Sequence, residues 1–546
     1  MFQPPQYFDI PHLDLLSWTL GNTNYDLDKP LFVNARDPIE SVSYNQATSY
    51  IRKLIAGFRA KGLQSGDSVC LHSFNSVYYS LIYLSVIGFG GRFVGSNPAY
   101  TIAELEHLFR ITGVSLVLTE PDLLHNVLVA AKVNAIPESK ILGFSSSGQP
   151  CSTELDSWRS LLQHGEIDWE TFDDEERAKG TIVALMSTSG TTGMPKAAEI
   201  SHYSQVAQSV MLYDSEAKQY PIRRLLCLPQ FHAFNAPLAH LAPLREGHTT
   251  YVMRRYHPKQ YTQFLAQYQI TETTMVNPII FNLLSMPDTE HASLDSLRFV
   301  WCGGVTLDAS VQNKLSSILN PEAAVAQVWG MTEVGWITTM HYPEKDTTGA
   351  VGRLLPNTEA KLLDPIDGTP ITQHSTRGEI YIRSPSVMTA YVSNSSATEE
   401  TIMNGWLRTG DIGYVSEDGK WYVVDRAKEL IKVRGWQVSP TEIEACLSTH
   451  PKIRDAAVIG VDFGDEKGEV PRGYVVLESS SESKLTNMER ELKSYLSGRL
   501  ANYKALDGGV KIVKSIPRSA AGKILRKVLK EGWRKGMETK RGHVDH

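Results

Sequence analysis

Signals for helices and strands alternate along this chain as far as about Gly349. Ser43-x-x-Gln46 is a capping box that predicts the start of an amphipathic helix, and a strand is predicted at Ser68–His72. Thr101-x-x-Glu104 predicts a second capped helix, and a second strand follows at Ser115–Thr119. The alternation recurs at three later apolar segments, Leu225–Leu228, Thr274–Val276 and Phe299–Cys302. Parallel strands need helical crossovers of this kind, so the pattern predicts an α/β fold.

Short strands replace this alternation towards the C-terminus. They are predicted at Gly378–Arg383 and, with a hairpin turn, at Gly413–Val424. Ser439 has the residue type of an N-cap and opens a compact α+β segment. We expect a large N-terminal domain of helix-flanked sheets plus a β-rich subdomain over residues 1–425, which would be followed by a small, mobile α+β C-terminal domain over residues 426–546.

The segment Ser187–Lys196 concentrates hydroxyls, glycines and one lysine directly after an apolar run, Thr181–Met186. Glycine lets the backbone approach an anion closely, and backbone N–H groups and hydroxyls donate to phosphate oxygens. The spacing Gly190-x-x-Gly193-x-x-Lys196 differs from that of the common NTPase loop. A polar loop without a ligand is the alternative. The predicted phosphate contacts are Thr188, Ser189, Gly190, Thr191, Thr192, Gly193 and Lys196.

Further motifs follow this loop in a fixed order: Gln327–Glu333, Thr409–Asp411, Asp425–Lys432 and Pro517–Lys523. In this order and spacing, nearly the whole chain resembles the adenylate-forming (acyl-CoA synthetase, AMP-binding) superfamily. The pattern is most similar to 4-coumarate–CoA ligase-like acid–CoA ligases. The resemblance implies an ATP-dependent ligase that forms an acyl-adenylate from a carboxylic acid and then an acyl-CoA thioester, by domain alternation. It also implies ATP, Mg²⁺ and coenzyme A as cofactors.

The resemblance implies roles for the residues around the nucleotide. Trp329 would lie flat against adenine, Asp411 would bind the ribose hydroxyls and Arg426 would contact the ribose. Thr332 would donate to the α-phosphate, and Glu333 would bind Mg²⁺. The alternatives are a turn cap for Thr332, a surface charge for Glu333 and structural ion pairs for Asp411 and Arg426. The remaining expected nucleotide contacts are Gly303, Gln327, Gly330 and Met331.

Two lysines near the C-terminus are expected to serve different half-reactions. By the resemblance, Lys523 would bridge the substrate carboxylate and the phosphate during adenylation. Lys432 and Gln437 would serve thioester formation, and Gly435-Trp436 would border the tunnel for coenzyme A. The small domain would rotate between the two steps about a hinge near Lys428. Solvated surface charges are the alternative for both lysines.

The expected acyl pocket departs from the family pattern at several positions. Its predicted residues are His232, Phe234, Asn277, Gly304, Val328, Val334 and Trp336. His232 would orient the carboxylate, although a lone histidine is more often a core residue. Ala233 stands where relatives that activate amino acids carry Asp, which argues against an α-amino acid. Val328 and Trp336 add bulk and Asn277 adds a polar group, so we expect a small or differently shaped acid, either aryl or short- to medium-chain.

Composition limits the partners that this chain can have. The net charge of −6 gives no reason to expect nucleic acid. The most apolar run, Tyr78–Phe89, is well below the roughly 20 residues that span a bilayer, and we expect it to form a buried helix. Five cysteines are scattered without a metal-binding spacing. With no signal peptide and no C-terminal Ser-Lys-Leu, a cytoplasmic location is expected. The oligomeric state is not predicted.

Three competing functions remain for this chain. They are loading of a carrier-protein thiol, a luciferase-like oxygenase and a non-enzymatic binding protein.

Overall fold

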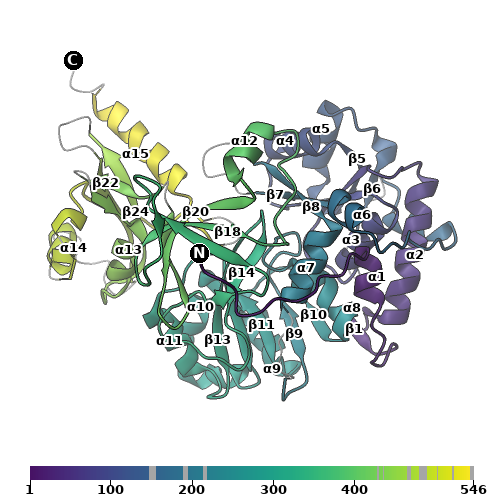
Figure 1. Ribbon diagram of the computed structural model, residues 1–546, viewed down its shortest axis with the longest axis horizontal. Coiled ribbons are helices and arrows are strands. Elements are labelled where there is room, and N and C mark those ends of the chain that lie inside the picture. The colour runs from purple at the N-terminus through teal and green to yellow at the C-terminus, as the bar shows by residue number, and fades with distance from the viewer. Residues whose placement is uncertain are drawn as a thin grey trace.

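The computed structural model describes residues 1–146, 155–188, 195–212, 218–426, 429–433, 436–463, 469–478, 488–497, 499–500, 502–518 and 522–541. Within them, the predicted alternation forms two helix-flanked sheets, which confirms the α/β class (Figure 1). An antiparallel sheet and a small α+β region complete the chain. None of the helices in these ranges combines the length and the apolar character that crossing a bilayer requires.

The strands of the first sheet are β3 (Ser68–His72), β4 (Arg92–Ser96), β5 (Val114–Thr119), β6 (Ile141–Gly143), β7 (Ile182–Ser187) and β8 (Ala197–Ser201). They lie in the order β6-β5-β3-β4-β7-β8, and only the β7–β8 pair is antiparallel. Their helices are α1 (Leu15–Leu20), α2 (Tyr44–Ala60), α3 (Tyr79–Gly88), α4 (Ile102–Thr112), α5 (Leu124–Val133), α6 (Glu175–Gly180) and α7 (His202–Leu212). Both predicted capping boxes form, at Ser43 of α2 and at Thr101 of α4.

The strands of the second sheet are β1 (Pro30–Asn34), β2 (Ser41–Ser43), β9 (Arg223–Leu226), β10 (Thr249–Val252), β11 (Glu272–Met275), β12 (Phe299–Cys302), β13 (Ala324–Met331), β14 (Gly335–Thr339) and β15 (Arg353–Leu354). They lie in the order β15-β14-β13-β12-β11-β9-β10-β1-β2, with antiparallel pairs only at the two edges. The accompanying helices are α8 (Ala242–Glu246), α9 (Pro258–Gln267), α10 (Asn277–Leu284) and α11 (Ala309–Ile318).

Helix α3 lies in the main core, and all of its residues are buried. The same apolar cluster includes Leu116 of β5 in the first sheet and Leu226 of β9 and Val252 of β10 in the second. A helix that is apolar on every side needs cover on every side, and the two sheets provide it. The prediction of a buried helix at Tyr78–Phe89 is confirmed.

Strands β9 and β11 begin about two residues before the predicted apolar segments, because each contains a charged residue that the apolar pattern left out. Arg224 and Glu272 lie opposite one another in the β9–β11 pair, and Arg224 Nε lies 2.9 Å from Glu272 Oε2. Both side chains are buried. The pair neutralises charges that would otherwise be too costly inside a sheet.

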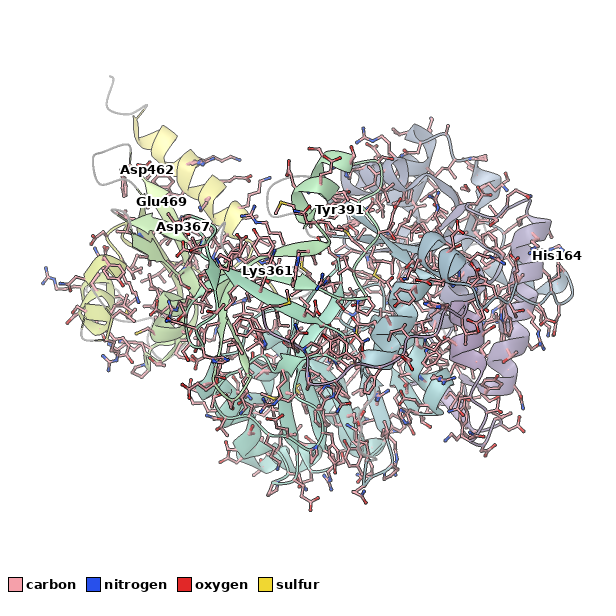
Figure 2. The ribbon with its side chains drawn as sticks, viewed as in Figure 1. His164, Lys361, Asp367, Tyr391, Asp462 and Glu469 are labelled. Carbon is pink, nitrogen blue, oxygen red and sulfur yellow. The ribbon has the colours of Figure 1, made fainter. Side chains whose placement is uncertain are left out.

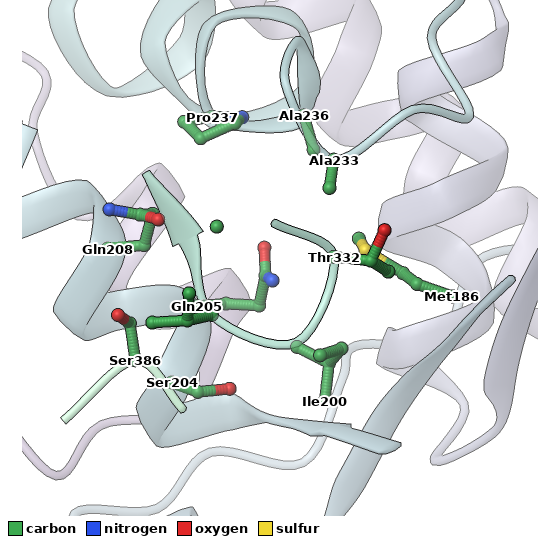
Figure 3. Close-up of a pocket in the computed structure, with 12 residues that line it drawn as sticks. Met186, Ile200, Ser204, Gln205, Gln208, Ala233, Ala236, Pro237, Thr332 and Ser386 are labelled. Carbon is green, nitrogen blue, oxygen red and sulfur yellow. The ribbon is translucent and has the colours of Figure 1, made fainter. Parts of the chain in front are cut away.

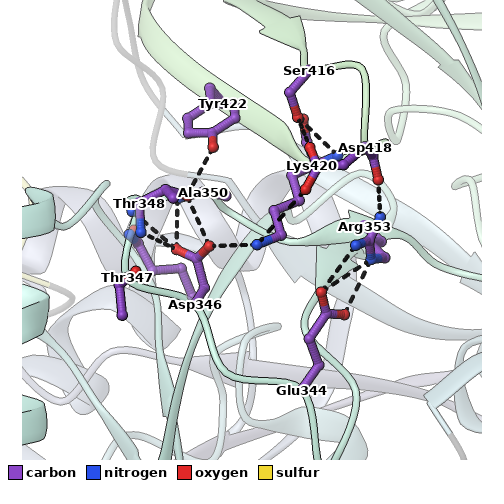
Figure 4. A network of polar contacts seen from close by, with 12 residues as sticks. Glu344, Asp346, Thr347, Thr348, Ala350, Arg353, Ser416, Asp418, Lys420 and Tyr422 are labelled. Carbon is purple, nitrogen blue, oxygen red and sulfur yellow. Dashed lines mark hydrogen bonds and ion pairs between the residues drawn. The ribbon is translucent and has the colours of Figure 1, made fainter.

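The antiparallel sheet contains β16 (Glu359–Leu363), β17 (Pro370–Ile371), β18 (Gly378–Arg383), β19 (Ile402–Met403), β20 (Trp406–Val415) and β21 (Trp421–Arg426), with α12 (Ser395–Thr401) beside it. A polar network joins its β20–β21 hairpin to the end of the second sheet (Figure 4). Lys420 Nζ donates to Asp346 Oδ1 at 3.0 Å, and the backbone N–H groups of residues 348–350 donate to Asp346 Oδ2. This network fixes the hairpin that carries Asp411 and Arg426.

The C-terminal elements are β22 (Ile431–Val433), β23 (Trp436–Val438), α13 (Pro440–Ser448), β24 (Ile453–Asp462), β25 (Glu469–Leu477), α14 (Met488–Ser497), β26 (Val510–Ile512) and α15 (Arg526–Arg541). They occupy one end of the molecule, and β18 and β20 lie between them and the first sheet (Figure 1). The predicted N-cap forms, because Ser439 Oγ accepts from the N–H of Glu442. Arg526 connects two segments of this region by pairing with Glu429 and Glu444.

Candidate active site

Asp411, Arg426 and Trp329 meet on the nucleotide side of the candidate site. Asp411 and Arg426 are opposite one another in the β20–β21 pair, and Arg426 Nε lies 3.0 Å from Asp411 Oδ1. The other carboxylate oxygen accepts from Trp329 Nε1 at 2.8 Å. The negative charge of Asp411 raises the pKa of Arg426. The sequence-predicted ribose and adenine residues are therefore in contact, and the ion pair expected as an alternative is also formed.

Glu333 lies beside the base of the predicted phosphate loop. Its Oε1 accepts from the hydroxyl of Tyr391 at 2.6 Å, and Lys196 Nζ lies 4.6 Å from the centroid of the Tyr391 ring. The backbone N–H of Thr188 donates to the carbonyl of Lys196 at 2.8 Å, which closes the base of the loop. Burial and the charge of Glu333 raise the pKa of Tyr391. Glu333 is itself buried, which rules out the surface charge that was its alternative.

Tyr391 is a residue of this site that the sequence analysis missed. It forms an isolated antiparallel bridge with Ala198, in the strand that follows the phosphate loop, and its N–H donates to Thr398 Oγ1 of α12. Figure 2 shows it close to that helix. A tyrosine outside the recognised motifs has no spacing signal, so only the fold could identify it. Among the described residues, no three His, Cys, Asp or Glu side chains converge to hold a metal by themselves.

Several predicted site residues lie outside the described residues. In the phosphate loop these are Ser189, Gly190, Thr191, Thr192 and Gly193, and in the C-terminal region they are Lys428 and Gly435. For Lys432, Trp436 and Gln437, only the backbone is described. In the β22–β23 hairpin, the backbone of Lys432 pairs with that of Gln437.

Lys523 lies on the same side of the site as Asp411 and Arg426. Burial lowers the pKa of Lys523, the charge of Arg426 lowers it further, and Glu429 and Asp411 act in the opposite direction. A Cβ on Gly522 would come within 3.0 Å of Pro278 Cδ, so the loop approaches the start of α10. A loop of the C-terminal region therefore reaches the nucleotide residues of the large region.

Arg518 holds the loop that carries Lys523. Its Nη1 donates to the carbonyl of Gly522 at 2.9 Å, and its Nη2 donates to Asp455 Oδ1 at 2.7 Å. The N–H of Leu525 donates to the carbonyl of Pro517 and closes the loop. The sequence motif contains Arg518 but gives no indication of this role, because its partner Asp455 is distant in sequence.

His232 is half-buried, and its hydrogen bonding defines its tautomer. Nδ1 accepts from the backbone N–H of Phe234 at 3.2 Å, so the ring proton is on Nε2. Burial lowers the pKa of His232, which favours the neutral ring. The His232 carbonyl accepts from Asn235 and Ala236, which start the following helical turn. A neutral imidazole with one N–H can orient a carboxylate.

Buried amides that the sequence analysis did not single out support the His232 segment. The N–H of Gln230 donates to Asn75 Oδ1, and Asn75 Nδ2 donates to the Leu228 carbonyl. The same carbonyl accepts from Asn235 Nδ2, and Asn235 Oδ1 accepts from Thr274 Oγ1. These bonds connect the segment to both sheets and fix its backbone.

The predicted acyl residues Phe234, Val328 and Trp336 belong to a packed aromatic cluster. The Phe234 and Trp336 rings stack with centroids 5.5 Å apart, and Trp301 meets Trp336 edge-on at 6.1 Å. The Trp336 Nε1 donates to the Phe234 carbonyl at 2.8 Å, and Val328 is buried in the same cluster. The expectation that Trp336 itself lines an open pocket needs correction, because its side chain is 2% exposed. Trp336 borders the acyl side through Phe234.

The other predicted contacts lie in β13, directly after β12 and at the start of α10. A Cβ on Gly303 would lie 2.7 Å from the Phe234 ring, and Gly304 has φ +86°. Asn277 is the first residue of α10. The side-chain amide of Gln327 is hydrogen-bonded to Leu307 and Gln312. Gln327 can therefore contact a nucleotide only through its backbone. Gly330 and Met331 end β13, and any Cβ on Gly330 would clash with the carbonyl of Gly335.

A small cavity of about 20 Å³ opens between these elements (Figure 3). Its walls come from the Thr332 turn, the segment after His232, the strands β7 and β8, and helix α7. The lining residues are Met186, Ile200, Ser204, Gln205, Gln208, Ala233, Ala236, Pro237, Thr332, Val334, Gly335 and Ser386. Thr332, which was predicted at the α-phosphate, and Val334, which was predicted in the acyl pocket, both line this cavity, and the residues of α7 were missed.

The comparisons with known proteins agree with this arrangement. The profile of the AMP-binding enzyme family matches residues 22–392, and that of the AMP-binding enzyme C-terminal domain matches residues 442–523. A phenylacetyl-CoA ligase from Aspergillus niger is 44% identical over 537 residues, covering 97% of this chain and 98% of that protein. An acyl-CoA ligase from another strain of this species is 44% identical over 536 residues, covering 97% and 100%.

Solved structures show the same architecture. ATP-bound MatB from Rhodopseudomonas palustris has a TM-score of 0.83 at 25% identity, covering 96% of this chain and 99% of that chain. The matched profiles, the ligases that resemble nearly the full length and the converging site residues lead to one conclusion. This chain belongs to the AMP-binding enzyme family and is an AMP-forming acyl-CoA synthetase, which ligates an acid to coenzyme A with ATP.

Proposed function

We propose that the described arrangement is the adenylation state of the enzyme, in which Lys523 serves acyl-adenylate formation. The position of Lys523 beside the Asp411–Arg426 pair carries this proposal. The adjacent Gly522 approaches Pro278, which follows the predicted acyl residue Asn277. A cation at this junction can contact both the α-phosphate and the substrate carboxylate.

In the first half-reaction, a carboxylate oxygen attacks the α-phosphorus of ATP and pyrophosphate leaves. Negative charge must be neutralised and the reactants must be aligned. We assign the neutralisation to Lys523 and Lys196, and the alignment to His232 Nε2–H and Thr332. Glu333 fits a Mg²⁺ site, because Mg²⁺ takes one or two carboxylates together with phosphate oxygens. Bound there, Mg²⁺ would neutralise phosphate charge.

For the second half-reaction, we assign thioester formation to Lys432 and Gln437. Their paired backbones in the β22–β23 hairpin support a joint role, and Gly435-Trp436 would border coenzyme A. A domain boundary near Arg426 with a hinge at Lys428 would let the C-terminal domain present this hairpin in place of Lys523. The two faces then act in turn at one site.

The hinge can be tested with Lys428→Pro. Proline fixes φ near −65° and removes a backbone N–H, so it blocks rotation at this position. We expect adenylation to persist while thioester formation falls about 100-fold. Lys428→Ala, which keeps backbone freedom, is the matched control. Equal competence of the proline variant in both steps would locate the pivot elsewhere.

We propose an aryl, arylacetic or short- to medium-chain acid as substrate. The similar ligase from A. niger is a phenylacetyl-CoA ligase, and the described residues that line the cavity include no acidic side chain to pair with an α-ammonium. The bulk of Trp336 and Val328 behind Phe234 also favours a compact acid. Release of pyrophosphate, screened over these acid classes with and without coenzyme A, identifies the preferred acid and the acceptor.

The assignment of Lys523 is tested by separating the half-reactions. We expect Lys523→Ala to lower acyl-adenylate formation by about 10³-fold, because a preorganised cation is lost. The variant should still convert supplied acyl-adenylate and coenzyme A to the thioester. Lys432→Ala should keep acyl-adenylate formation and lose thioester formation. Equal impairment of both half-reactions in Lys523→Ala would contradict the proposal.

We also propose a cytoplasmic location. Cys70, Cys227 and Cys302 are buried free thiols, which suits a reducing compartment. Fractionation of cells that produce the tagged protein tests this, and recovery from an organelle would overturn it.

A further inference from the structure

The acyl side of the site has one closed wall and one open wall. Phe234, Trp336 and Trp301 fill the closed wall, and the polar atom of the Trp336 indole is already bonded to the Phe234 carbonyl. The open wall is the cavity between Thr332 and α7 (Figure 3). An acid with its carboxylate at Thr332 and His232 therefore has room for its remote end towards α7.

Most polar groups around this cavity are engaged by the protein itself. Gln208 Oε1 accepts from the N–H of Trp336 at 2.6 Å, and Gln208 Nε2 lies 3.5 Å from the Trp336 carbonyl. Ser204 Oγ donates to the carbonyl of Ser201, and the Ser386 hydroxyl lies 3.0 Å from that of Ser384. These groups fix the walls, and they are not available to form hydrogen bonds that distinguish one ligand from another.

Gln205 differs from these groups. Its Oε1 accepts one long hydrogen bond, from the Tyr83 hydroxyl at 3.4 Å. Over the ranges that the structure describes, its amide nitrogen donates to no protein group. Figure 3 shows the Gln205 amide projecting into the space between α7 and Thr332. The cavity thus has walls whose polar groups are mostly bonded within the protein, and one amide N–H₂ directed into it, with a volume that suits a water molecule or a single polar substituent.

We propose that Gln205 is a specificity-determining residue, which selects carboxylic acids that carry a hydrogen-bond acceptor at the end remote from the carboxylate. A hydroxyl, a carbonyl or a ring nitrogen has this chemistry. The inference rests on the proposed use of this cavity for the acyl group. An apolar end would displace water from the amide without replacing its hydrogen bond, and a donor that the bound acid covers but does not pair disfavours such an analogue.

Matched acid pairs test this inference. Each pair is built on the preferred acid of the pyrophosphate screen and differs only at the remote end, with ring nitrogen against C–H, as in 4-pyridylacetate and phenylacetate, or hydroxyl against methyl. For the wild type, we expect kcat/KM for the acceptor-bearing acid to exceed that of its partner by at least about tenfold. Gln205→Leu has similar volume and no donor, and it should reduce the ratio to about 1.

Gln205→Glu separates donor from acceptor. A carboxylate cannot donate to a ring nitrogen but can accept from a hydroxyl, so preference for the nitrogen acid should be lost while that for the hydroxyl acid remains. Gln208→Leu is the control on the same helix. It leaves the Trp336 N–H without its acceptor and should lower Tm while keeping the wild-type ratio.

The outcomes are distinguishable. A wild-type ratio near 1, or an unchanged ratio in folded Gln205→Leu, overturns the role of Gln205 and leaves the ligase activity intact. Turnover of no acid in the screen overturns the proposed substrate classes instead. A ratio that falls equally in Gln208→Leu would show that wall geometry, rather than the Gln205 amide, sets the preference.

Discussion

The two sides of the acyl-CoA synthetase site are held together by different interactions. The nucleotide side is held by charge, with Asp411 and Arg426 on one hairpin and Glu333 and Lys523 from segments farther away in the chain. The acyl side is held by packing, through the stacked rings of Phe234 and Trp336 and the amides of α7. Charge acts over several ångströms and can connect two domains that move, whereas packing needs contact and a fixed shape.

This difference predicts two ways for the site to fail. Loss of a charge on the nucleotide side should change ATP use and pH dependence with the fold intact. Loss of volume on the acyl side should lower stability and change acid preference together. Substitutions on one side of the site therefore test whether their effects stay on that side.

Asp411→Ala should have the largest effect. It removes the acceptor of the Trp329 indole and the partner of Arg426, which leaves a cation without its buried carboxylate. We expect kcat/KM for ATP to fall about 10³-fold, with little change in the relative rates of different acids. Asp411→Asn retains one acceptor and should lose less. A changed order of acid preference in Asp411→Ala would show that the two sides are not separable.

Trp336→Ala removes the indole behind Phe234. We expect the free energy of unfolding to fall by about 3 kcal/mol, measured by chemical denaturation, because a fully buried tryptophan leaves a cavity. Phe234 loses its stacking partner and can move into the void, so kcat/KM across a homologous acid series should shift towards bulkier acids. Trp336→Phe is the control and should retain most of both properties. Equal slowing of every acid would mean that the indole does not shape the acyl side.

The fall in adenylation activity at alkaline pH, its alkaline limb, should follow the deprotonation of Lys523. Burial lowers the pKa of this lysine, so it loses its proton at a lower pH than an exposed lysine does. Because the proposed role needs the ammonium, kcat/KM for pyrophosphate release should fall about tenfold per pH unit above that pKa. Thioester formation from supplied acyl-adenylate should lack this limb. In Lys523→Arg, the limb should move to higher pH, and an unmoved limb would assign it to another group.

Sequence reasoning predicted the nucleotide side far better than the acyl side, for a physical reason. Phosphate, ribose and Mg²⁺ require particular donors and charges, so Asp411, Arg426 and Glu333 lie within recognisable motifs. An acyl wall requires only volume, which many sequences supply, and the direction of Trp336 depends on Phe234 and Trp301 in distant segments. The buried Arg224–Glu272 pair shows the same limit in the fold. The role of a charged residue inside a strand can be recognised only once its partner is known.

Gly303→Ala is the finest test of the boundary between the two sides, and its effect should be the smallest. A Cβ at this position would lie 2.7 to 3.2 Å from three atoms of the Phe234 ring. The ring cannot retreat freely, because Trp336 stacks on it at 5.5 Å, so it must tilt into the space for the acid. We expect KM for the preferred acid to rise less than about tenfold while KM for ATP stays constant. Trp336→Phe in the same chain should restore part of the loss, because a smaller ring gives Phe234 room. A rise in KM for ATP would place Gly303 on the nucleotide side instead, as a wall of the adenine site.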